Sequence, residues 1–176
     1  SKGPSTECQW NLLKLLKEEL EELDMHEIEL DECGYLYATL PASSTVTNFE
    51  PICFLAHVDT SPDAPGENVE PRIIENYQGG EITFPKNKEL RLNPEISPFL
   101  NKCIGDSIIT TAGDTLLGAD DKSGVAVIMT MLACFQKFKD IPHGEVKVCF
   151  TRDEEIGRGV DEINASKLPK YCYTLD

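Results

Sequence analysis

The sequence predicts an α/β fold in which a mostly parallel β-sheet is sandwiched by helices. Segments with the apolar spacing of helices alternate along the chain with short apolar runs that are typical of strands. The run Ile52–Ala56 is apolar at every position, which indicates a strand buried on both faces, as in parallel sheets. A length of 176 residues suits one domain, or one and a fraction, and is enough for a substantial core.

The first part of the chain predicts a helix followed by a hairpin. From Thr6 to about Leu23 apolar residues recur every three or four positions, and Thr6 with Gln9 fits a capping box at the helix start. The strand-like segments 27–30 and 35–40 flank a short polar turn, which predicts an antiparallel pair.

The rest of the chain predicts further strands and helices. Residues 59–107 are rich in proline, glycine and asparagine and are expected to be mainly loop with short strands. The remaining expected elements are a hairpin of 108–111 with 115–117, an apolar helix over 125–138, a central strand over 145–150, a short helix near 160–168 and a core strand over 171–175. The sequence stops directly after that strand, so we expect its C-terminus to be cut within a domain.

Composition and charge argue against several classes of function. The formal net charge is −15, whereas nucleic-acid and anionic-membrane surfaces need clustered lysine and arginine. No apolar run is long enough to cross a bilayer, and no signal-peptide pattern opens the chain. The seven cysteines are an odd number without a C-x-x-C pair, so we expect reduced thiols and a cytoplasmic protein.

Acidic residues gather where the predicted strands end. They are Asp59, two residues after His57; Asp120 and Asp121 after the hairpin; Asp153, Glu154 and Glu155 after the central strand; and Asp176 after the last strand. In open α/β sheets, ligands bind at the carboxyl ends of the strands. One histidine and several carboxylates gathered there suit a dinuclear site for zinc or a similar divalent ion.

Each of these signals has a simpler interpretation when it is taken alone. The pair His57 and Asp59 is a weak motif by itself, and Asp121 can be an ordinary helix cap. Asp153 is expected to lie in a solvated turn. The prediction of a metal site therefore depends on the whole set.

Two other binding motifs match the sequence in part but lack residues that they require. Residues 113–118 match the glycine spacing of a phosphate loop, but Ala119 and Asp120 replace its lysine and hydroxyl residue. Residues 59–70 place oxygen ligands as in a calcium loop, but Ala64 replaces the required glycine and prolines interrupt the segment. We therefore reject nucleotide binding and give calcium little weight.

Four stretches of sequence resemble a known family. They are HVDTSPDAPGENVEP at 57–71, TLLGADDKSG at 115–124, IPHGEVKVCFTRDEEIGRG at 141–159 and CYTLD at 172–176. Together they closely resemble the dizinc metallopeptidases that include aminoacylases and carboxypeptidase G, and the likeness runs along nearly the whole chain. The resemblance implies that residues 1–176 are the N-terminal portion of a zinc-exopeptidase-like catalytic domain. The implied activity is zinc-dependent release of the N-terminal residue from tripeptides.

The resemblance also implies roles for individual residues. The metal ligands would be His57 and Asp176 for one zinc ion, Asp120 as the bridge between two ions, and Glu155 for the second ion. Asp59 would orient the His57 imidazole, and Glu154 would be the general base that activates the attacking water. The peptide bond between Asp120 and Asp121 would be cis.

Part of the family pattern is not found in this sequence. The family supplies a second histidine ligand from farther along the chain, so we expect the second zinc site to be impaired and His26 and His143 to be structural. The lid and dimerisation domain and the C-terminal part of the catalytic domain are also expected to be absent, and the full-length parent would be a homodimer. Three interpretations stay open: a working tripeptide aminopeptidase, an inactive metal-binding fragment, and a related dipeptidase or deacylase.

Overall fold

The computed structural model describes residues 3–43 and 48–176. It divides the chain into two compact units, of which the first contains Ser1–Thr60 with Ala119–Asp176 and the second contains Ser61–Gly118. Each unit has a buried apolar cluster of its own. None of the helices in the described residues is long and apolar enough to cross a membrane.

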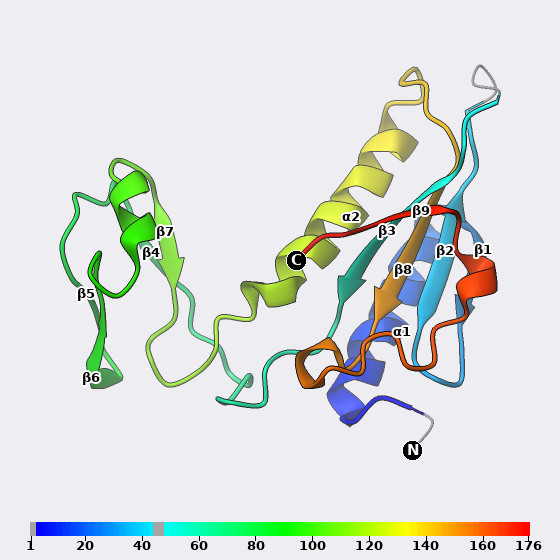
Figure 1. Cartoon of the computed structure of the whole chain (residues 1–176). Coiled ribbons are helices and arrows are strands. Elements are labelled where there is room, and N and C mark those ends of the chain that lie inside the picture. Colours follow the sequence, from blue (N-terminus) through cyan, green and yellow to red (C-terminus); the bar gives the residue numbers. More distant parts are fainter. Residues whose placement is uncertain (1–2, 44–47) are drawn as a thin grey trace. The chain divides into compact units, whose positions relative to one another are not determined.

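A five-stranded sheet in the order β1-β2-β8-β3-β9 forms the centre of the first unit (Figure 1). Its strands are β1 (His26–Leu30), β2 (Leu36–Leu40), β3 (Ile52–His57), β8 (Val146–Thr151) and β9 (Tyr171–Thr174). β3 pairs in parallel with both β8 and β9, whereas the predicted hairpin of β1 and β2 joins β8 in antiparallel register. Every strand of this sheet except β2 therefore runs in the same direction, which confirms an α/β fold with a mixed, mostly parallel sheet.

The strand β9 differs from the expected core strand. In the described part of the chain it lies at one side of the sheet, and all four of its residues are exposed. Its position explains the exposure, because β3 is the strand that adjoins it and no helix is among its main contacts.

Two α-helices, α1 (Glu7–Glu22) and α2 (Ala119–Lys137), flank the sheet. Successive side chains of a strand point to opposite faces, and the even-numbered apolar positions of β2, β3 and β8 share one cluster with both helices. The fully buried members of this cluster include Leu13 and Leu20 from α1, Ile128 and Leu132 from α2, and Phe150 from β8. The two helices thus pack against the same face, rather than one on each face as the predicted sandwich requires.

The other face of the sheet is covered by the irregular segment between β8 and β9. A second apolar cluster lies on this face. In it, Ile163 and Leu168 of the segment pack against residues of the sheet and of the turn before β2, namely Tyr35, Tyr37, Cys53, Leu55 and Cys149. The short helix expected near 160–168 is reduced to a single 3-10 turn, Ala165–Lys167. Tyrosine hydroxyls accept the N–H groups of Glu162 (3.3 Å) and Asn164 (3.0 Å), so these two N–H groups bond to side chains and not to the backbone of a continuous helix.

The helix α1 begins after Thr6 as predicted, but without the predicted capping box. Thr6 makes no capping hydrogen bond through its side chain. Gln9 is buried, and its amide donates to Oγ1 of Thr6 (3.0 Å) and to Oδ1 of Asp153 (2.8 Å). Because Gln9 takes part in this tertiary contact, it does not serve as the reciprocal acceptor of a capping box.

The second unit contains two small sheets, as expected for a loop-rich segment with short strands. Its elements are β4 (Arg72–Ile74), β5 (Ile82–Phe84), β6 (Asn87–Leu92), the 3-10 helix η1 (Pro98–Lys102) and β7 (Ile108–Thr110). β5 pairs with β6, and β7 pairs with β4, so the predicted hairpin of 108–111 with 115–117 is wrong. In place of that pairing, the Leu116 N–H donates to the backbone oxygen of Pro65 at 2.9 Å.

Candidate metal centre

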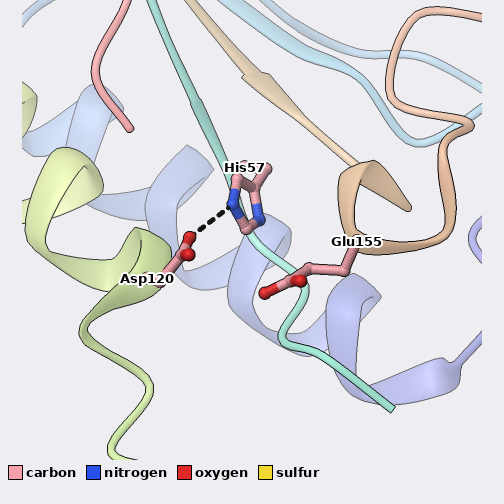
Figure 2. A group of neighbouring side chains, drawn as sticks. All are labelled: His57, Asp120 and Glu155. Atoms are coloured by element: carbon pink, nitrogen blue, oxygen red, sulfur yellow. Dashed lines mark hydrogen bonds and ion pairs between the residues drawn. The ribbon is translucent and has the colours of Figure 1, made fainter. Parts of the chain in front are cut away.

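The predicted ligands come together where β3, β8 and β9 end. In the parallel register His57 pairs with Thr151, so the residues that follow these strands leave the sheet at the same end. Those residues are Asp59 after β3, Glu154 and Glu155 in the 3-10 turn η2 (Glu154–Ile156) after β8, and Asp176 after β9. The start of α2 brings Asp120 to the same place (Figure 2).

His57 lies at the centre of this cluster and is 1% exposed. Its Nδ1 is 3.1 Å from the backbone oxygen and 3.2 Å from Oδ1 of Asp59. Its Nε2 is 2.9 Å from Oδ1 of Asp120 and 3.8 Å from Oε2 of Glu154. Figure 2 shows the Asp120 carboxylate facing the ring, with the Glu155 carboxylate close by.

These contacts favour a positive charge at the ring. When Nδ1–H donates to Asp59, a neutral imidazole presents the lone pair of Nε2 to the carboxylate of Asp120, and the two repel. A proton or a metal cation at Nε2 removes that repulsion. Burial lowers the pKa of His57, but the hydrogen bonds to Asp59 and Asp120 and the neighbouring charges outweigh it and raise the pKa to about 9.

Asp59 connects the histidine to both glutamates. Its Oδ1 accepts the backbone N–H of Glu154 and its Oδ2 accepts that of Glu155, each at 3.0 Å. Burial raises the pKa of Asp59, yet the hydrogen bonds from His57 and the two amides outweigh it and lower the pKa below the ordinary value. Asp59 is therefore an ionised acceptor that fixes the imidazole and the turn after β8 together. Lys122 donates to the backbone oxygen of the same residue at 3.3 Å.

The start of α2 is held by Asp121, which the sequence indicated as a helix cap. Its Oδ1 accepts the N–H of Gly124 at 3.0 Å and its Oδ2 accepts the N–H of His57 at 3.0 Å, so it caps the helix and also binds the end of β3. A Cβ atom at Gly124 would lie 2.3 Å from Oδ1 of Asp121 and 2.6 Å from the backbone oxygen of Leu175. Only glycine allows this close approach. The peptide bond between Asp120 and Asp121 is cis, as the family resemblance implies.

Two sets of side chains in the described residues could each hold a metal ion. One set is His57, Asp120 and Glu155; the other is His57, Glu154 and Asp176; within each set the ligand atoms lie within 4.8 Å of one another. Imidazole nitrogen and carboxylate oxygen are ordinary zinc ligands, so the donor chemistry fits that ion. The two sets contain the four predicted ligands and also Glu154, the predicted base. Asp120 and Glu155 fall in one set, Glu154 and Asp176 fall in the other, and His57 belongs to both.

Asp153 is the residue whose part in this site the sequence did not reveal. Expected in a solvated turn, it is fully buried and has left-handed backbone (φ 53°). Its carboxylate accepts from Ser5 Oγ (2.6 Å), Gln9 Nε2 (2.8 Å) and Arg152 Nη1 (2.5 Å). Burial raises the pKa of Asp153, but these partners outweigh it and lower the pKa to about 2. The ionised carboxylate thus anchors the turn that carries Glu154 and Glu155.

The other two histidines lie outside both sets. The ring of His143 packs on Phe135 at 4.5 Å between centroids, and its Nδ1 is 2.9 Å from the backbone oxygen of Gly144. His26 is exposed at the start of β1. Neither belongs to a set of possible ligands in the described residues, in line with their expected structural roles.

Comparisons with known proteins agree on one kind of relative. No protein-family model matches the chain. It is 50% identical over 174 residues to peptidase T of Escherichia coli (strain SE11) and 49% identical over 174 residues to peptidase T of Escherichia fergusonii, covering 98% of this chain and 42% of each relative.

The solved structures that resemble this chain are proteins of the same kind. Aminopeptidase PepT from Bacillus cereus superposes with a TM-score of 0.67 at 27% identity, over 100% of this chain and 39% of that protein. A tripeptidase from Staphylococcus aureus superposes with a TM-score of 0.66 at 25% identity, over 93% of this chain and 36% of that protein. The chain is thus a homologue of peptidase T that spans about two fifths of the length of the relatives it matches.

Proposed function

We propose that the first unit is the zinc-binding part of an aminopeptidase that releases the N-terminal residue from tripeptides. The observation that carries the proposal is the cluster of one buried histidine and four carboxylates at the ends of three parallel strands and the start of α2. Two similar proteins of known structure are described as an aminopeptidase and a tripeptidase, which supports this substrate class. Because the chain spans 42% of the curated relatives, the proposed activity is that of a protein of their length.

Zinc would be held by His57, Asp120, Glu155 and Asp176. We assign His57 and Asp176 to one ion, Asp120 to a bridge, and Glu155 to a second ion. The negative charge gathered around one imidazole supports a cation at this place, since carboxylates near a single buried histidine repel one another unless a cation lies among them. When bound, zinc would lower the pKa of water and polarise the peptide carbonyl.

The protein side chains then have separate tasks. Asp59 would keep the proton of His57 on Nδ1, so that Nε2 faces the site with its lone pair. Glu154, whose side chain is half exposed, would accept the proton of the attacking water at Oε2 and pass it to the leaving amine. Asp153 would hold the turn that presents Glu154, because its buried carboxylate ties that turn to the start of α1.

Tripeptide hydrolysis with added zinc tests the proposal. Glu154→Gln keeps the size of the side chain but removes its ability to take a proton, and we expect a loss of about 100-fold or more in kcat. Glu162→Gln, on the same segment but outside both sets of ligands, is the matched control and should leave the rate unchanged. Equal rates for the wild-type chain and Glu154→Gln would rule out a working enzyme in this chain.

The same assay separates the alternatives. Zinc binding without Glu154-dependent hydrolysis would support a metal-binding unit that is inactive by itself. Faster cleavage of dipeptides or acyl-amino acids than of tripeptides would support a related dipeptidase or deacylase.

A further inference from the structure

Two cysteines face each other across β3 and β9, outside the candidate metal centre. Cys53 of β3 is paired with Cys172 of β9 in the parallel register, so both side chains lie on the same face of the sheet. Neighbouring strands are about 4.7–4.9 Å apart, which lies within the Cα separation of about 4.4–6.8 Å that a disulfide requires.

The two thiols differ in access to solvent. Cys53 is fully buried, whereas Cys172 is exposed. Burial raises the pKa of Cys53 to about 12, so this thiol is a poor nucleophile while it is covered. An incoming reagent would therefore meet Cys172 first.

We propose that Cys53 and Cys172 are an oxidisable pair that forms a cross-strand disulfide when a low-molecular-weight disulfide such as oxidised glutathione is present. The Cys172 thiolate attacks one sulfur of the reagent, which gives a mixed disulfide and releases one reduced thiol. Cys53 then attacks the Cys172 sulfur and transfers its proton to the second departing thiolate. In total the protein loses two hydrogens, and the reagent is reduced to two thiols.

A further thiol on this face, that of Cys149, is less well placed. Cys149 of β8 lies opposite Leu55 rather than Cys53, so it is a diagonal neighbour of Cys53. It is also fully buried, which removes it from contact with a soluble oxidant. A direct pair with one exposed member therefore favours Cys53 with Cys172.

The consequence of the bond would be a covalent link between two strands that end at the site. Cys53 precedes His57 by four positions and Cys172 precedes Asp176 by four positions. Oxidation would fasten β9, which is exposed throughout, to the buried strand β3. The disulfide itself does not depend on the proposed peptidase activity.

Peptide mapping tests this proposal on the whole folded chain. The chain is treated with oxidised glutathione, its remaining thiols are alkylated, and it is digested without reduction by trypsin and chymotrypsin. Cleavage after Phe49 separates Cys53 from Cys33, cleavage after Lys147 separates Cys149, and cleavage after Lys170 releases the segment with Cys172, so mass spectrometry identifies the partners. We expect a linked pair of these two peptides, an intact mass lower by two hydrogen atoms, and reversal of both by a reducing agent.

Two variants serve as controls. Cys172→Ser replaces an exposed residue and should abolish the link completely while Cys53 becomes free for alkylation after unfolding. Cys103→Ser, in the second unit, should leave the link unchanged. A stable glutathione adduct on Cys172 without the link, or a dominant link of Cys53 to Cys149, would overturn the proposal.

Discussion

Both units of the chain carry acidic residues at their surfaces, but the surroundings of these residues differ. In the second unit the carboxylates of Glu70 and Asp114 pair with the exposed Lys86, and Glu81 pairs with Arg91. In the first unit carboxylates from three separate segments converge on one buried histidine. These three carboxylates of the second unit thus have cationic partners of their own, whereas those around His57 share a single imidazole.

The cores of the two units explain this difference. The largest cluster of the first unit has fifteen buried apolar residues, and that of the second has four, so the first offers the firmer platform for side chains from distant segments. Three parallel strands end together on that platform. Convergence of charge, rather than the number of acidic residues, therefore marks the candidate site.

The largest expected effect comes from His57, which belongs to both sets of ligands. His57→Ala should lower the affinity for zinc by more than about 100-fold, beyond the roughly 10–100-fold typical of losing a partner outside the ligand shell. Titration calorimetry with zinc measures this loss, and Glu81→Gln in the second unit is the control that should bind normally. Unchanged zinc affinity in His57→Ala would contradict the comparison between the units.

Equivalent leucine truncations compare the two cores. Leu132→Ala removes a fully buried side chain from the larger cluster and should lower the free energy of unfolding by about 2–5 kcal/mol. Leu100→Ala in the smaller cluster should cost less, because fewer fixed neighbours surround the cavity. Urea unfolding measures both values, and an equal or greater cost for Leu100→Ala would show that cluster size is not what separates the units.

A smaller loss of zinc affinity is expected from a change at Asp59, which contacts His57 but is not itself a predicted ligand. Asp59→Asn keeps the shape of the side chain but cannot accept the two backbone amides of Glu154 and Glu155 with both of its terminal atoms. We expect zinc affinity to fall by about 10–100-fold. Asp63→Asn, in an exposed loop of the second unit, is the matched control. If both variants bind zinc alike, Asp59 does not orient the site.

The smallest effect concerns acid stability and Asp153. The pKa of its buried carboxyl is lowered from 3.8 to about 2 in the folded chain, so its contribution is complete above pH 3.8 and is lost as the pH falls toward about 2. The loss amounts to about 2 kcal/mol of unfolding free energy. Asp153→Asn should remove this dependence, while Asp161→Asn at an exposed position should keep it; urea unfolding over this pH range is the measurement. A difference between wild type and Asp153→Asn that stays constant across the range would contradict the prediction.

Much of the fold could be predicted because the first unit follows simple periodicity. The apolar spacing of α1, the continuous run of β3 and the hairpin of β1 with β2 all gave the right elements. The hairpin expected at 108–117 failed because β7 pairs with β4, about 35 positions earlier, and local sequence does not report that partner. The placement of both helices on one face likewise depends on strand order, which no single segment encodes.

The sequence indicated which residues gather at the ends of the strands, whereas their roles as ligands and base stay predictions. Carboxylates at strand ends are visible in the sequence, but the division of ligands into two sets depends on distances between side chains. Asp153 was expected in solvent because three consecutive acids usually indicate a solvated turn. Its burial depends on Ser5 and Gln9, which lie 148 and 144 residues away along the chain.

The parallel register of β3 and β8 also limits how this sequence can vary in length. His57 is paired with Thr151 at the last step of the ladder, and the glutamates follow within one short turn. Because side chains alternate between faces, one inserted residue within β3 would turn the imidazole to the opposite face of the sheet and away from Asp120. Insertions and deletions should therefore be rare within these strands and freer in the exposed loops of 61–118. The positions of insertions and deletions, more than those of substitutions, would then show which parts of the chain must keep a fixed length to hold the site together.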